Sequence, residues 1–61
     1  MTEEREFFLK LNVDVAKILS ALEVRYIIER NPVSKTRINH LLRRLYVVKE
    51  EINDALKEVW E

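Results

Sequence analysis

The sequence contains no cysteine and no glycine, and only one proline and one histidine. Without cysteine there is no disulfide framework, and His40 alone offers too few ligands for a structural metal ion. Without glycine there is no glycine-rich loop to cradle a phosphate group. Domains near this length of 61 residues often need disulfides, metals or oligomerisation. Of these three, the sequence leaves oligomerisation, and we expect neither a metal nor another cofactor.

The chain also lacks a long uninterrupted apolar run. Its first residues, from Thr2 to Glu6, are acidic in balance rather than basic. We therefore expect no signal peptide, no transit peptide and no membrane span. A chain without cysteine fits an intracellular, cytoplasmic location. The charged fraction of 36%, with glycine, cysteine and glutamine all absent, resembles the residue usage of heat-adapted proteins.

What the sequence does contain is two apolar stripes at helical spacing, one on each side of Pro32. Each stripe predicts an amphipathic α-helix, the first over about residues 3–30 and the second over about residues 34–60, with a turn at about 31–33. Thr2 is the expected N-cap of the first helix. The residues predicted for the core and dimer interface are Phe8, Leu11, Val15, Ile18, Leu22, Ile38, Leu41, Leu45, Val48, Ile52 and Val59.

Two starting points compete for the second helix. Pro32 disfavours helical geometry at Asn31 and so ends the first helix. The second helix then begins with Ser34 as its N-cap, between Val33 and Ile38 as a hydrophobic staple, or with Asn31 as its N-cap and Pro32 as its first residue. Either start leaves a link of about two to four residues, which makes the two helices antiparallel neighbours.

Two helices alone cannot enclose a core, so the stripes predict an assembly. The expected fold is all-α. A two-helix antiparallel hairpin forms a single domain over residues 1–61 and dimerises into an antiparallel four-helix bundle. An aromatic cluster of Phe7, Phe8 and Trp60 is expected where the termini converge.

A second apolar strip on the first helix lies opposite the main stripe, where one hairpin partner cannot cover it. We interpret it as a contact surface for higher assembly or for another protein; the alternative is a few exposed aliphatic residues of the kind that small proteins tolerate. The strip consists of Leu9, Val13, Val24 and Ile27.

Charge is balanced in total, with 11 basic and 11 acidic residues, but it is divided along the chain. Residues 25–49 contain one acid, Glu29, and all but four of the basic residues. In a hairpin, the turn end is therefore basic and the end that holds the termini is acidic. Antiparallel packing of two hairpins would set the basic end of each beside the acidic end of the other and so select that orientation.

The basic turn end also supports a second interpretation, in which it binds nucleic acid. The candidate residues are Arg37, His40, Arg43 and Arg44, which lie on the polar part of the second helix and could contact phosphate groups. The neutral total charge and the lack of a DNA-reading motif weaken this interpretation. A run of charges is also commonly no more than a solvated face.

No residue pattern indicates catalysis. Ser20 has no evident base, and His40 is expected on the exposed face of its helix. Glu50, Glu51 and Asp54 are expected on an open face, whereas paired acid–base carboxylates need a cleft. We therefore expect a non-enzymatic adaptor or regulator whose partner is a second copy of itself. The alternatives are a nucleic-acid-binding regulator and a subunit of a hetero-complex.

This layout resembles that of Rop-type proteins, in which two helical hairpins form a four-helix bundle that contacts RNA. It is similar, too, to small viral or plasmid adaptors of the same shape. The resemblance concerns the arrangement of two apolar helices around a short turn; it covers no motif and transfers no binding residue.

Overall fold

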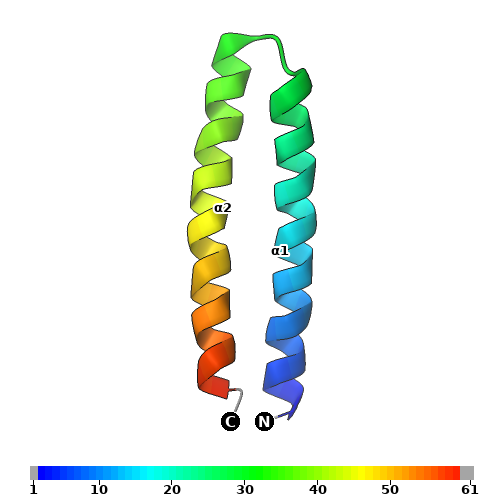
Figure 1. Ribbon diagram of the computed structural model, residues 1–61, viewed down its shortest axis with the longest axis vertical. Helices are drawn as coiled ribbons and strands as arrows, with labels where there is room; N and C mark the ends of the chain where they lie inside the picture. The colour runs from blue at the N-terminus through cyan, green and yellow to red at the C-terminus, as the bar shows by residue number, and fades with distance from the viewer. Residues whose placement is uncertain (1, 60–61) are drawn as a thin grey trace.

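The chain folds into two long helices, α1 (Thr2–Ile28) and α2 (Pro32–Val59), in a computed structural model that describes residues 2–59. The helices run antiparallel and side by side, joined by a short turn at one end of the molecule (Figure 1). The result is a thin rod with extents of 45 × 15 × 11 Å. The prediction of an all-helical, two-helix hairpin is confirmed.

The core is a narrow seam where α1 faces α2. Its buried residues are Val15, Leu19, Leu42, Ile52 and Leu56. Half-buried residues pack against them, namely Phe8, Leu11, Leu22, Ile38 and Leu45. Among the side chains of residues 3–59 none is completely shielded from solvent, since each helix contacts one neighbour only.

The seam differs in part from the expected apolar stripes. Ile18, Leu41 and Val48, which were expected in the shared core and dimer interface, are 49%, 50% and 39% exposed in the hairpin. Leu19 and Leu42, which follow Ile18 and Leu41 in the sequence, lie in the seam instead. One helix covers only part of a broad apolar stripe, so the remaining part of each stripe faces solvent on the flank of the hairpin.

The turn ends in a side-chain cap on α2. Asn31 Oδ1 accepts hydrogen bonds from the backbone N–H of Val33 at 2.9 Å and of Ser34 at 3.3 Å. The Lys35 N–H donates to the Asn31 carbonyl at 2.9 Å, which is the first helical bond of α2. Of the two predicted starts, the structure has Asn31 as the N-cap and Pro32 as the first helical residue.

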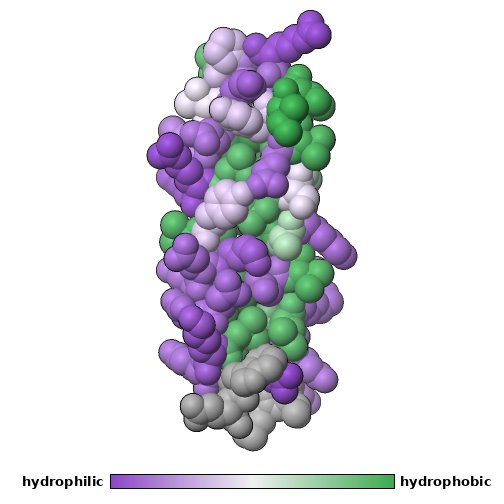
Figure 2. All heavy atoms as spheres, in the orientation of Figure 1, coloured by the Kyte–Doolittle hydropathy of each residue, from purple (hydrophilic) through white to green (hydrophobic). Residues whose placement is uncertain are grey.

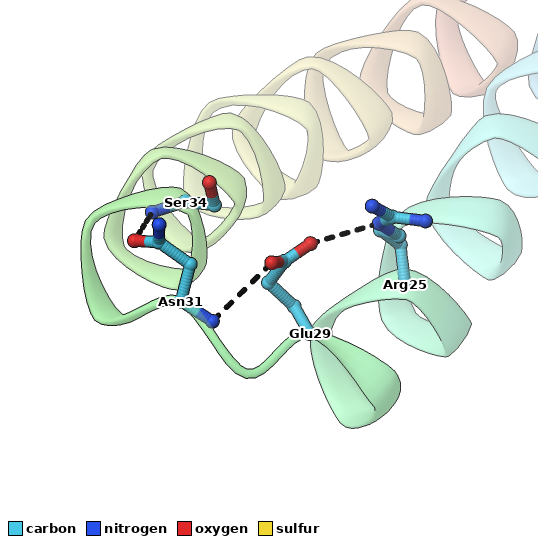
Figure 3. A network of polar contacts seen from close by, with 4 residues as sticks. All are labelled: Arg25, Glu29, Asn31 and Ser34. Atoms are coloured by element: carbon cyan, nitrogen blue, oxygen red, sulfur yellow. Dashed lines mark hydrogen bonds and ion pairs between the residues drawn. The ribbon is translucent and has the colours of Figure 1, made fainter.

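A small polar network joins this cap to the end of α1 (Figure 3). The Glu29 carboxylate accepts from Arg25 Nε at 3.0 Å and from the Asn31 N–H at 3.3 Å. α1 therefore ends at Ile28, two residues before its expected end, because Glu29 closes the turn. The cap expected from the Thr2 side chain and the contacts expected of Trp60 concern side chains outside those that the structure describes.

Candidate interaction surfaces

One side of the seam is joined by polar contacts between the two helices. Lys49 Nζ donates to Asn12 Oδ1 at 3.0 Å, and the Tyr46 hydroxyl donates to the Glu23 carboxylate. We call these four residues the polar flank. The hydrogen bond to Glu23 raises the pKa of Tyr46, and desolvation and the negative charge of Glu23 raise it further. The polar side chains on this side of the seam therefore bond to each other within one hairpin.

The other side of the seam is apolar and open to solvent. With about 3.6 residues per helical turn, Ile18 lies roughly 140° around α1 from Glu23, and Leu41 and Val48 lie at least as far around α2 from Tyr46. These residues therefore lie on the other side of the seam from Glu23 and Tyr46. We call this surface the apolar flank; it comprises Phe7, Ile18, Leu41 and Val48, which are 61%, 49%, 50% and 39% exposed.

Phe7 extends the apolar flank toward the end of the rod that holds the chain termini. Its ring contacts that of Phe8 edge-on, with centroids 5.5 Å apart and an interplanar angle of 68°. Phe8 packs on the seam, whereas Phe7 faces solvent. Phe7 was expected in an aromatic cluster at the termini and not in the interface. Its spacing of 11 residues from Ile18, about three helical turns, was the signal for this flank.

The outer strip of α1 forms a third surface. Its four predicted members are exposed, Leu9 by 38%, Val13 by 53%, Val24 by 59% and Ile27 by 76%. They lie on the side of α1 that faces away from the seam and from the apolar flank. In the view of Figure 2, hydrophobic side chains reach the surface between hydrophilic ones along the rod and gather near the turn end. α1 thus has apolar residues on nearly opposite faces.

The basic residues near the turn are divided between two faces. Arg37, His40 and Arg44 surround an open hollow on α2 together with Leu41. Arg43 lies about 100° around the helix from Arg44 and does not line this hollow. The structure therefore brings together three of the four candidate nucleic-acid-binding residues. Because Leu41 belongs to the apolar flank, the hollow borders that surface.

Residues 2–59 contain neither a metal-binding cluster nor a membrane-spanning helix. No group of three or more His, Asp or Glu side chains in this range is placed to hold a metal ion. Within the same range, neither helix has an apolar stretch long enough to cross a membrane. Comparison with protein-family models, curated proteins and solved structures gives no match for this chain.

Proposed function

We propose that this protein is a non-catalytic interaction module that acts as a homodimer, with two hairpins packed antiparallel as a four-helix bundle. The observation that carries the proposal is the apolar flank, whose four residues are between 39% and 61% exposed in the single hairpin. Removing apolar surface from water is favourable by about 25 cal/mol per Å². A second copy presents the same flank, as a two-fold symmetric interface requires.

The charge distribution supports the antiparallel orientation. α2 has no acidic residue in its first turn, and Lys35 and Arg37 lie close to that positive end of the helix dipole. This placement disfavours the isolated helix. In an antiparallel dimer the basic turn end of each hairpin lies beside the acidic terminal end of the other, which compensates for the cost and disfavours the parallel dimer.

The test is sedimentation equilibrium combined with thermal melts at several protein concentrations. We expect the mass of a dimer and a melting temperature that rises with concentration. The Val48→Lys variant should be monomeric because it places a charge in the interface, whereas Val47→Lys should remain dimeric, since Val47 is 57% exposed and lies outside the flank. A compact wild-type monomer that melts cooperatively at micromolar concentration would disprove the proposal.

The outer strip would give the dimer a surface for another protein, which is the role of an adaptor. Val13→Lys and Val24→Lys place charges in the middle of this strip while leaving the apolar flank unchanged. Both variants should keep the mass of the wild-type dimer in sedimentation. Loss of the dimer in either variant would mean that the strip belongs to the dimer interface and is not a separate surface.

A second candidate function, nucleic-acid binding, is favoured by the hollow that gathers Arg37, His40 and Arg44. If it is correct, fluorescence anisotropy with labelled RNA or duplex DNA should show binding that weakens steeply with salt. Arg43→Glu/Arg44→Glu should abolish the binding. Arg44→Glu alone should weaken it more than Arg43→Glu alone, because only Arg44 lines the hollow. No binding at low salt would contradict this candidate.

A further inference from the structure

A row of charged residues follows the apolar flank along α2 at intervals of seven residues. The row consists of four exposed residues, Arg37, Arg44, Glu51 and Glu58. Within residues 2–59 no hydrogen bond or ion pair engages these four side chains. Leu41, Val48 and Ala55 repeat beside the row at the same interval. Positions seven apart remain on one face of a helix in a left-handed bundle, so both rows lie along one edge.

The row has two basic residues followed by two acidic ones, so in a reversed copy of the helix each basic position is matched by an acidic one. Its midpoint falls between Arg44 and Glu51, next to Val48, which is itself the midpoint of the apolar row. In an antiparallel pair of identical helices, residues equally far from the two-fold axis on opposite sides face each other. With the axis near Val48, Arg44 of one copy faces Glu51 of the other, and Arg37 faces Glu58. Large Leu41 then faces small Ala55.

α1 independently shows the same distribution of charge, basic toward the turn and acidic toward the termini. Residues seven apart on the corresponding edge run from acidic through apolar to basic: Glu4, Leu11, Ile18 and Arg25. The short turn between Ile28 and Pro32 places the end of α1 about level with the start of α2 (Figure 1). Counted from there, the midpoint of the α1 row is within about two residues of the midpoint of the α2 row. One two-fold axis therefore satisfies both helices.

We propose that the second copy docks with α2 against α2 and α1 against α1, in a single register set by Arg44–Glu51 and Arg37–Glu58 ion pairs between the copies. The proposal rests on the proposed homodimer. It makes every neighbouring pair of helices antiparallel, which opposes their dipoles. Charges at the edge of an apolar seam select partner and orientation in this way in coiled coils. The pairing also occupies Arg37 and Arg44, which the nucleic-acid candidate needs free.

A charge exchange tests the register. In the dimer, Arg44→Glu converts two attractive contacts into repulsive ones, and we expect the dissociation constant to rise about tenfold or more. Arg44→Glu/Glu51→Arg should restore it to near the wild-type value. Arg43→Glu makes the same charge change outside the row and should leave dimerisation nearly unchanged. If the double variant is as weak as the single one, or Arg43→Glu is equally weak, the register is wrong.

A cysteine cross-link tests the axis directly, because the natural chain contains no cysteine. Val48→Cys should form a covalent dimer quickly under mild oxidation, since the two thiols meet at the axis within the roughly 7 Å between Cα atoms that a disulfide spans. Val47→Cys, one residue away and facing outward, is the control and should cross-link slowly. A wild-type dimer in which both variants cross-link equally would overturn the register alone. A wild-type monomer would instead overturn the proposed function.

Discussion

Lys49 donates a hydrogen bond to Asn12 Oδ1 across the seam at 3.0 Å, joining residues that are 37 positions apart in the sequence. Both side chains are half-buried on the polar flank. Removing only one of the two partners costs free energy, because the remaining polar group stays half-buried without a hydrogen-bond partner. The pair therefore favours one level of α1 against α2 over helices that have slipped by a turn.

The first prediction concerns this pair. Asn12→Ala should lower the free energy of unfolding by about 1–2 kcal/mol, because the Lys49 ammonium stays half-buried without its acceptor. Asn12→Leu/Lys49→Met, which replaces both partners by apolar residues of similar size, should be about as stable as the wild type or more so. Urea denaturation at one fixed protein concentration measures both. Equal stability of Asn12→Ala and the wild type would show that the bond contributes nothing.

The second prediction separates the two helix starts that the sequence allowed. Asn31→Ala removes the acceptor of the Val33 and Ser34 N–H groups and should destabilise the fold by about 1 kcal/mol. Ser34→Ala removes a hydroxyl that caps nothing in the structure and should change stability by less than about 0.5 kcal/mol. Thermal melts of the two variants at matched concentration decide the matter, and a larger loss for Ser34→Ala would contradict the cap.

The third prediction uses two aliphatic neighbours on α1. Leu19 is 5% exposed in the seam, so Leu19→Ala should destabilise the hairpin and the dimer alike by about 2–4 kcal/mol. Ile18 is 49% exposed in the hairpin, and Ile18→Ala should be costly only where a second copy covers it.

Melts over a range of concentrations distinguish these cases. Ile18→Ala should reduce the concentration dependence of the melting temperature and raise the dimer dissociation constant. A small effect of Ile18→Ala on both quantities, in a protein whose wild type is dimeric, would place Ile18 outside the interface.

The fourth prediction concerns alkaline pH. The hydrogen bond to Glu23 raises the pKa of Tyr46 above its usual 10.0, so the folded state holds the phenolic proton more tightly than the unfolded chain does. The resulting stabilisation is fully present below about pH 10 and is lost as the pH rises through the pKa of the folded state.

Tyr46→Phe should therefore show a shallower loss of stability above about pH 10 than the wild type. Tyr26→Phe leaves the bond to Glu23 intact and serves as the control. Thermal melts over the alkaline range, together with the ultraviolet absorbance of tyrosinate, supply the measurement. An identical slope for Tyr46→Phe and the wild type would mean that the bond does not persist in solution.

Much of the hairpin could be predicted because its determinants are local. Helical periodicity depends on residues three and four apart, and Pro32 acts on its immediate neighbour Asn31. The exact ends of the helices could be predicted less well. Glu29 ends α1 through hydrogen bonds to Arg25 and Asn31, and this network depends on side-chain geometry that spacing does not reveal.

The candidate surfaces were only partly predictable for a similar reason. The outer strip was identified from spacing, and all four of its residues are exposed. The grouping of the basic residues was not, since Arg43 and Arg44 are chemically alike and adjacent, yet only Arg44 lines the hollow. The polar flank was missed because Asn12 and Lys49 are distant in the sequence and neither has a distinctive local pattern.

By itself, the sequence determined two amphipathic helices, their short antiparallel link and the division of charge between the two ends of the rod. These follow from local propensity, from proline geometry and from counting residues. Only the tertiary structure decided which apolar residues fill the seam and which remain on its flank. Ile18 and Leu19 differ by one position, and a rotation of about 100° exposes the first and buries the second. Helix packing sets that rotation, because α2 can cover only one part of a stripe that is wider than a single contact.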